Sequence, residues 1–548
     1  MSRPAGGGGL AAGLAGALGD ASRARGLGLR LLVVALALPF AAPLAYLVVR
    51  NVDEGGAWST VSDGALLAPL GRSLLLAGSV AAAAGVVGTA AAWLVTRTDL
   101  PGRRVLRLLL PLPLVLPSFI GAFALIAAFA PGGLLERALS PLGVSGLPSV
   151  EGFAGAFVVL TLLTYPYVYL PVAARLRQLA PAMEEAARLL GRGPAETFRT
   201  VVLPQARAAM AGGALLVFLY VIADFGAVQL LRYDTLTRAI YANYLLDPPT
   251  AVALSLALGL LAIAVVVAQR RVAGGRRPDA RREGRPLTVP LGRWRGPATA
   301  FVGGLLALAL AAPVAVLVYW TARGVSAGSS RPNSLVADPG RLVEPVLNTS
   351  LASVAAALVA VAVVLPAAFL TTRHRGRVGD GAAALVVGGF ALPGLVIALA
   401  LAFWTLRSPG IIGALYQTLP LLVGAYALHF GALALGPAQV AASSVPRGLD
   451  DAARTLGRGR LARLATIDLP LMAPGLAAGA GLVLLSAMKE LPVTLLLAPA
   501  GFPTLATRIW SSTEDAFWAD ASIAALALVA VSGALTWLLV VRRERRFS

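Results

Sequence analysis

Long apolar stretches alternate with short polar segments along almost the whole of this 548-residue chain. A helix that crosses a bilayer needs about 20 predominantly apolar residues. Twelve stretches approach or exceed that length, with boundaries defined to within several residues. They cover residues 31–49, 73–96, 107–130, 152–174, 208–230, 250–269, 298–320, 350–372, 382–406, 411–440, 474–497 and 520–541. The pattern predicts an all-α membrane protein with about twelve transmembrane helices.

The composition supports a bilayer as the solvent. Hydrophobic residues make up 58% of the chain, charged residues only 13%, and the mean hydropathy is +0.79. A soluble chain of this length could not bury so much apolar surface. There is no cysteine, which excludes a disulfide framework and a thiolate metal site.

The net charge of +20 comes from arginines placed between the apolar stretches rather than in one patch. This placement argues against a nucleic-acid partner. If the amino terminus lies inside, 35 of the 45 arginines fall in the inner segments. An excess of arginine on the cytoplasmic side is typical of membrane proteins. We therefore expect twelve spans with both termini in the cytoplasm.

Polar segments divide the chain into five parts. Residues 1–29 are rich in glycine, alanine and arginine and are predicted to form a disordered cytoplasmic tail. Residues 30–269 and 297–541 each hold six spans, and residues 542–548 form a second cytoplasmic tail. Between the halves, residues 270–296 are basic and lack apolar periodicity, as in a solvated linker. A segment that binds phospholipid headgroups is a compatible alternative.

The two halves repeat each other. Residues 93–97 (Trp-Leu-Val-Thr-Arg) match residues 369–373 (Phe-Leu-Thr-Thr-Arg) at an offset of 276, and after a slip of ten residues the offset becomes 266. Because each half holds six predicted spans, both copies enter the membrane in the same orientation. This predicts a parallel repeat about an axis along the membrane normal, with a pathway between the halves.

One polar loop in each half carries the same motif at constant spacing. Acidic residues suit the first turn of a helix, and a glycine suits a left-handed position at its end. A later Leu-Pro marks the entry to the next span, so we predict a helix–turn–helix. The motif comprises Glu185, Ala186, Ala187, Gly191, Leu203 and Pro204 in the first half and Asp451, Ala452, Ala453, Gly457, Leu469 and Pro470 in the second.

These two loops resemble the "EAA" loops of inner-membrane permeases from binding-protein-dependent ABC importers. The resemblance spans roughly residues 70–270 and 345–540. It implies the type I ABC importer permease fold in a bacterial inner membrane, with each loop seated as a coupling helix in a groove of a cytoplasmic ATPase. Asp451 departs from the usual glutamate, which keeps the charge but alters a possible contact.

Further segments resemble ferric-iron permeases with fused halves. They are residues 223–226 (Ala-Asp-Phe-Gly), 235–241, 488–497 and 504–510. The resemblance implies ferric iron as cargo. Thiamine permeases with fused halves and permeases for small anions such as sulfate share the loop and remain alternatives.

The chain itself is predicted to be a transporter subunit and not an enzyme. Lys489 is its only lysine and does not lie in a phosphate-binding loop, so any ATP-driven work must come from a partner. The resemblance implies that this partner binds ATP and magnesium. The resemblance implies two copies of an ABC ATPase and an extracytoplasmic binding protein, with no cofactor in this chain. An ion-coupled secondary transporter is the alternative from another class, but it leaves the paired loops without a role.

Two acidic residues are candidates for the translocation pathway. Asp224 and Glu490 occupy equivalent positions, each 20 residues after the Leu-Pro proline of its loop. Ionisable groups at span depth usually face a cavity or a partner, and carboxylates suit a hard cation. The alternative is that they cap helix ends interrupted by Gly226 and Pro492. No metal-binding or catalytic arrangement stands out.

Overall fold

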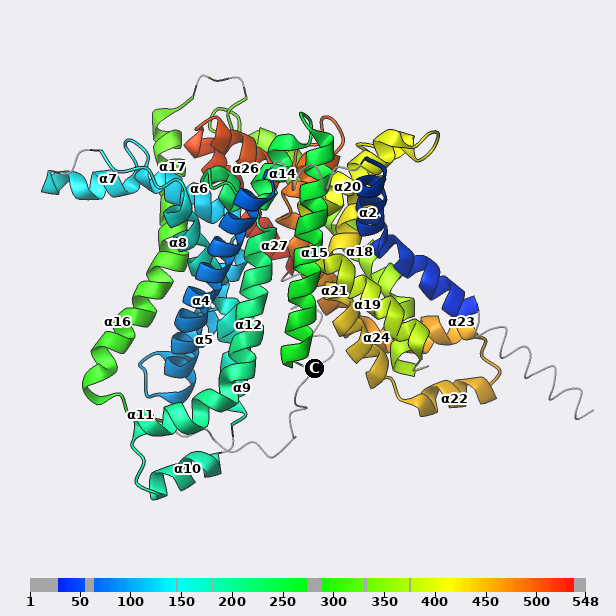
Figure 1. Cartoon of the computed structure of the whole chain (residues 1–548), viewed down its shortest axis with the longest axis horizontal. Coiled ribbons are helices and arrows are strands. Elements are labelled where there is room, and N and C mark those ends of the chain that lie inside the picture. Colours follow the sequence, from blue (N-terminus) through cyan, green and yellow to red (C-terminus); the bar gives the residue numbers. More distant parts are fainter. Residues whose placement is uncertain are drawn as a thin grey trace, which may run out of the picture.

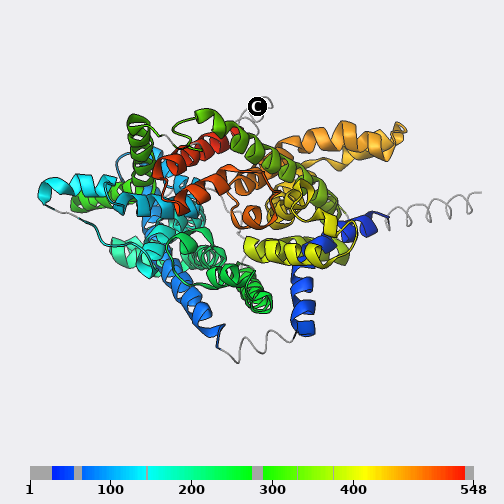
Figure 2. The ribbon, with the colours of Figure 1, turned by 90° about the horizontal axis from the view of Figure 1, so that it is seen from above.

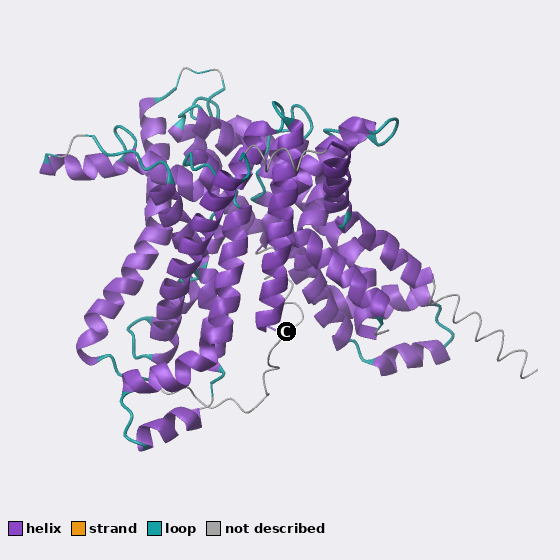
Figure 3. Ribbon diagram, viewed as in Figure 1, coloured by secondary structure: helices purple, strands orange, loops and turns teal. Residues whose placement is uncertain are grey.

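The computed structural model describes residues 28–54, 64–143, 146–179, 181–273, 288–329, 331, 333–373 and 376–536. These residues are overwhelmingly helical and include no named strand, only an isolated bridge between Thr98 and Val289 (Figure 3). The predicted all-α class is confirmed. The two predicted tails and the central part of the predicted linker lie almost wholly outside the described residues.

Within the described residues, ten helices are long and apolar enough to cross a membrane, or up to twelve if two bent helix pairs each count as one span. The pairs are Gly28–Phe40 with Ala42–Asp53, bent by 55°, and Arg377–Ala391 with Gly394–Arg407, bent by 100°. The prediction of about twelve spans is confirmed. The predicted span 382–406 contains the sharper bend, where Pro393 lacks the N–H that a continuous helix requires.

The repeat found in the sequence recurs helix by helix. α4 (Leu67–Arg97) and α18 (Val343–Arg373) each have 31 residues and begin 276 residues apart. The later pairs of equivalent helices are α6 (Ser118–Phe129) with α20 (Gly394–Arg407), α12 (Leu203–Ala223) with α24 (Leu469–Met488), α13 (Gly226–Leu230) with α25 (Pro492–Leu497), α14 (Leu236–Asn243) with α26 (Leu505–Glu514), and α15 (Pro248–Ala273) with α27 (Trp518–Thr536).

The remaining elements complete the two bundles. They are η1 (Leu38–Phe40), α2 (Ala42–Glu54), α5 (Arg103–Leu109), η2 (Leu112–Val115), α7 (Leu134–Leu139), η3 (Ser140–Leu142), α8 (Phe153–Thr164), α9 (Pro166–Arg177), η5 (Gly292–Trp294), α16 (Arg295–Leu306), η6 (Ala307–Ala311), α17 (Ala312–Ala327), η7 (Pro339–Leu342), α19 (Arg377–Ala391), η8 (Gly413–Leu415) and α21 (Leu419–Ser444). α8 and α9 together correspond to the single helix α21, which starts 266 residues later.

Three further predicted spans are wrong in their continuity, and the first of them, 107–130, is divided among α5, η2 and α6. α12 stops at Ala223 and α24 at Met488, so spans 208–230 and 474–497 are each broken and resumed as a short helix. A Cβ on Gly226 would lie 2.7 Å from Phe119 Cβ, so only glycine allows this close approach to α6. In the second half, Pro492 lacks the N–H that an unbroken helix needs.

The first span of each half packs on its own half and also contacts the other half. α2 contacts α20, and α17 contacts α6, so the two bundles are interleaved at their edges (Figure 2). Trp320 Nε1 donates to the carbonyl of Ala127 at 2.9 Å, and the Tyr319 hydroxyl donates to that of Gly132 at 2.7 Å. These bonds satisfy carbonyl groups at and beyond the end of α6 that have no partner within the helix.

The halves lie close together at one end of the molecule and diverge toward the other (Figure 1). α14 and α26 lie at the closed end. The short helices α10 (Pro181–Leu189) and α22 (Arg447–Thr455) lie at the open end, which we name the loop end.

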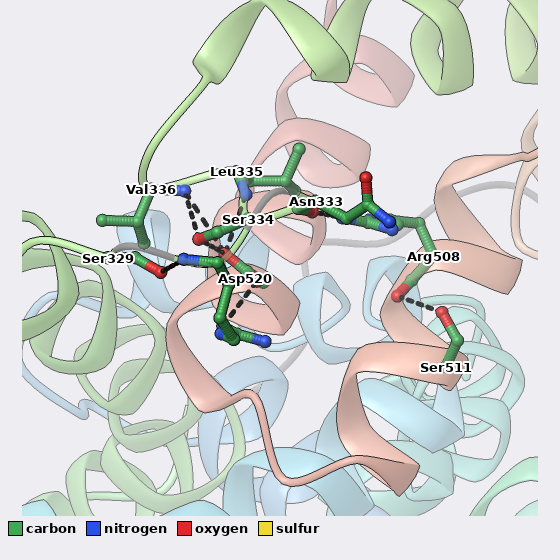
Figure 4. A network of polar contacts seen from close by, with 9 residues as sticks. Ser329, Asn333, Ser334, Leu335, Val336, Arg508, Ser511 and Asp520 are labelled. Carbon is green, nitrogen blue, oxygen red and sulfur yellow. Dashed lines mark hydrogen bonds and ion pairs between the residues drawn. The ribbon is translucent and has the colours of Figure 1, made fainter.

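A loop at the closed end is held by one buried carboxylate. Asp520, at the start of α27, accepts hydrogen bonds from Ser334 Oγ at 3.0 Å and from the N–H groups of Leu335 at 2.9 Å and Val336 at 3.3 Å (Figure 4). Its other oxygen lies 2.9 Å from the Arg331 guanidinium. Because a buried carboxylate is costly unless its oxygens are bonded, this cluster fixes the loop between α17 and α18.

Candidate coupling loops and the junction between the halves

Both motif loops form the predicted helix–turn–helix. In the first half, α10 is followed by α11 (Pro194–Thr197) and η4 (Phe198–Val202), which leads into α12 at Leu203. In the second half, α22 is followed by α23 (Arg460–Arg463) and η9 (Leu464–Asp468), which leads into α24 at Leu469. The helix after the turn therefore forms in both halves, although only the first begins with proline.

The spacing from alanine to glycine is explained by the end of each short helix. Gly191 has φ of +83° and Gly457 has φ of +75°, the left-handed conformation that favours glycine. Beyond each glycine, an arginine N–H donates to the carbonyl of the motif's second alanine, Ala187 or Ala453, at 3.1 Å and 3.0 Å. This is the bonding pattern of a Schellman cap. The predicted cap is present in both loops.

Each short helix has a buried side and an exposed side. Ala187 and Ala453 are buried, whereas Glu185 and Asp451 are exposed. The residue directly after each short helix is an exposed leucine. Leu190 and its counterpart Leu456 are 80% and 81% exposed. Because apolar side chains held out at a loop tip are typical of an interaction site, the exposed sides form a candidate docking surface.

The first loop is fastened to the bundle by an ion pair that the sequence analysis missed. Arg97, the last residue of α4, pairs with Glu184 on α10, and their side chains are only 1% and 5% exposed. Trp93, one turn earlier, packs edge-to-face on Phe198 with ring centroids 5.4 Å apart. The only signal in the sequence was the repeat of residues 93–97 as 369–373, which gives no indication of a partner.

The second loop has a different anchor. Arg373, the counterpart of Arg97, pairs with Asp468 on η9 at 3.0 Å. The position equivalent to Asp468 in the first half is Val202, which cannot form an ion pair. The two arginines are thus retained at the ends of α4 and α18, and among the described side chains their acidic partners come from different parts of the loop.

Asp224 and Glu490 lie just beyond the ends of α12 and α24, and each caps the helix that follows. Asp224 Oδ1 accepts from the N–H of Ala227 at 3.0 Å, and Glu490 Oε1 accepts from that of Val493 at 3.3 Å. The capping that the sequence left open as an alternative is therefore observed. The two carboxylates are also near enough for their charges to interact, so the structure brings these distant residues together.

The surroundings of the two carboxylates differ in a complementary way. Ser118, at the start of α6, lies beside Asp224. Its counterpart at the start of α20 is Gly394, and a Cβ there would collide with Glu490 Oε1. The longer acid therefore faces glycine and the shorter acid faces serine. His429 Nε2 also lies beside Gly394, 3.3 Å from the same Cβ position.

Residues next to Asp224 and Glu490 make contacts that join the two halves. Lys489 does not pair with its neighbour Glu490; its Nζ donates to the carbonyl of Leu114 in η2 at 3.1 Å. Phe225 stacks on Trp510 with centroids 5.6 Å apart. Among the described residues, no group of three or more histidines, cysteines and acids could hold a metal ion.

An internally repeated helical bundle with two capped loops at one end defines a class of membrane permease. The chain matches the family described as the binding-protein-dependent transport system inner membrane component, over residues 84–277 and again over 342–548. It belongs to that family, and the double match confirms the repeat and the type I ABC importer permease fold. It is therefore a multi-pass inner-membrane transporter subunit, and the family's transport systems include a binding protein and an ATPase.

Individual relatives refine this assignment. The chain is 30% identical over 522 residues to the Fe(3+)-transport system permease protein FbpB 2 of Haemophilus influenzae, covering 93% of this chain and 97% of that protein. Shorter matches include the sulfate transport system permease protein CysT of Salmonella typhimurium, 33% identical over 37% of this chain and 72% of the relative. The molybdenum transport system permease protein ModB of Mycobacterium bovis is 32% identical over 41% and 87%.

Proposed function

We propose that this chain forms the transmembrane pathway of an ATP-driven ferric-iron importer and that its two motif loops receive the motion of a cytoplasmic ATPase. The observation that carries the proposal is the pair of capped helices α10 and α22, which present the exposed Leu190 and Leu456 at one end of the bundle. Because the loops are equivalent, each receives one ATPase copy, giving two copies per chain.

The loop end lies in the cytoplasm, as do both termini. This orientation is supported by the arginines of the inner segments, whose excess on the cytoplasmic side is typical of membrane proteins. The binding protein then docks at the closed end, where α14 and α26 lie. No cofactor resides in this chain, and ATP and magnesium are bound by the partner.

Ferric iron is the cargo favoured by the comparisons. Similarity to the Fe(3+)-transport relative covers both fused halves, whereas the sulfate and molybdenum relatives match less than half of the chain. Sulfate and molybdate remain alternative cargoes because these relatives do match part of the chain. Thiamine remains an alternative because thiamine permeases share the motif loop. The family relation leaves the ion-coupled secondary transporter without support.

The halves diverge toward the loop end (Figure 1), and we infer that this is the arrangement before the ATPase copies close. When the ATPase copies close on ATP, they draw α10 and α22 together. The motion passes to α4 through Arg97 and Glu184, and to α18 through Arg373 and Asp468. The halves then rock about their junction, which opens the closed end to the binding protein.

We place Asp224 and Glu490 on this pathway, at the junction that must separate when the closed end opens. Asn and Gln retain an oxygen that can cap a helix, so Asp224→Asn and Glu490→Gln remove the charge but keep the bonds to Ala227 and Val493. We expect both variants to assemble with the ATPase and to transport poorly. Unchanged uptake in both would remove these residues from the pathway.

The proposal is tested by uptake of labelled ferric iron into vesicles that contain this chain, its ATPase and its binding protein. Labelled sulfate, molybdate and thiamine are measured in parallel. We expect ATP-dependent iron uptake that is lost in Glu185→Lys, where the exposed charge of α10 is reversed. Uptake of another compound would correct the cargo, and uptake without the ATPase would overturn the importer assignment.

A further inference from the structure

The end of the segment that joins the halves is bound to the first coupling loop's anchor. Val289 donates its N–H to the carbonyl of Arg97 at 2.8 Å, and the N–H of Leu291 donates to Asp99 Oδ1 at 2.8 Å. Thr98 and Val289 form the one isolated bridge of the described chain. Leu291 is buried, so this segment packs on the bundle rather than passing over it.

The bond from Val289 satisfies one of the carbonyl groups at the end of α4. The last carbonyl groups of a helix have no partner within it, and exposed ends fray unless other groups bond them. Here Arg107 donates to the carbonyl of Val95 at 3.2 Å, and Arg103 donates to that of Thr98 at 3.1 Å. The carbonyl of Arg97 itself is bonded by Val289. The joining segment therefore caps the helix at the residue that holds Glu184.

Arg97 is thus the meeting point of three chain segments. Its guanidinium binds Glu184 of α10, its carbonyl binds Val289, and its helix runs into the membrane. The position of a guanidinium depends on the backbone that carries it. A frayed last turn would let Arg97 move and would loosen α10.

We propose that residues 288–291 are a permanent brace of the first coupling loop, and that Asp99 and Val289 are positioning residues for transmission of the ATPase motion. The proposal deepens the proposed function and rests on it. The segment that connects the two halves would then also help to transmit the ATPase motion to the first loop. The brace stays in place while α10 and α4 move together.

The first test weakens the brace in the full chain with its ATPase and binding protein. Asp99→Ala removes the acceptor for Leu291, and Val289→Pro removes the donor to Arg97. Pro290→Ala is the matched control, because Pro290 is exposed and has no N–H to lose. We expect about a tenfold drop in iron taken up per ATP hydrolysed in the first two variants, within the usual range for coupling between sites, and no drop in the control.

The second test locks the brace. The chain has no cysteine, so Thr98→Cys with Val289→Cys creates a single pair at bridge partners, whose spacing suits a disulfide. We expect the oxidised and reduced forms to transport alike. In the Asp99→Ala background, oxidation should restore coupling and reductant should abolish it again. A disulfide that stops transport would show that the segment must detach, and the proposal would be wrong.

A third measurement needs no transport. Ala187→Cys places a thiol on the buried side of α10. If the brace holds this helix, maleimide should label that thiol several-fold faster when Asp99→Ala is added. Equal labelling overturns the brace, and so does unchanged coupling in both Asp99→Ala and Val289→Pro. Failure of the unmodified chain to take up iron with ATP would instead count against the proposed function, and the labelling result would still decide the brace.

Discussion

The two halves of this permease share their helices but differ in how they hold their coupling loops. α10 and α22 have the same length, the same glycine cap and the same exposed leucine position. The first loop is anchored through Glu184 within the coupling helix, and the second through Asp468 in η9. Duplication has thus kept the shape of the two motif helices, and the ion pairs of the described side chains hold the two loops at different points.

The junction shows the same kind of divergence. Asp224 beside Ser118 in one half corresponds to Glu490 beside Gly394 in the other. In each case the carboxylate caps the next helix. The paired changes keep the space filled, which indicates that packing at the junction limits which acid can be used.

The largest expected effect comes from breaking the more deeply buried anchor. Arg97→Met leaves Glu184 buried without a partner, which costs about 3–5 kcal/mol. Arg373→Met should cost less, because Arg373 and Asp468 are 16% and 10% exposed and water reaches them. The measurement is the thermal unfolding midpoint of each variant in lipid nanodiscs.

The double variant Arg97→Met with Glu184→Met sharpens this prediction. An apolar pair of similar volume can replace a buried ion pair at little cost, so most of the lost stability should return. Equal midpoints for Arg97→Met and Arg373→Met would contradict the difference between the two anchors.

A smaller effect is expected at the junction. Gly394→Ser pushes a side chain into Glu490, and overpacking of this kind costs about 1–3 kcal/mol. Adding Glu490→Asp shortens the acid and reproduces the arrangement of Ser118 and Asp224. A double-mutant cycle on the unfolding midpoint should therefore show that the two changes compensate each other. Additive losses would show that the sizes of these residues are unrelated.

Local patterns predicted much of this structure. The offsets of 276 and 266 fixed which helices are equivalent, and the spacing to Gly191 and Gly457 predicted the left-handed caps. The spans were predicted as continuous, and helix ends interrupted by Gly226 and Pro492 were kept only as an alternative. Apolar character continues through both breaks, so hydropathy cannot distinguish one span from two helices.

Contacts between distant segments could not be predicted. Arg97 was visible as part of a repeat, but nothing local identifies Glu184 or Val289 as its partner. The contacts of α2 and α17 with the opposite halves could not be predicted either, because the apolar pattern of a helix does not indicate which helices it contacts. The identity of the cargo depends on comparison with relatives and on the uptake experiment.

The central claim is that both loops contact the ATPase, and cross-linking from single cysteines tests it most directly. Leu190→Cys and Leu456→Cys are made in this cysteine-free chain, with Leu246→Cys as the control. Leu246 is 88% exposed but follows α14 at the closed end. The account predicts that a short thiol-reactive cross-linker joins both loop variants to the ATPase and leaves the control free. Absence of a product from both loop positions, in a complex that still hydrolyses ATP and takes up iron, would contradict it.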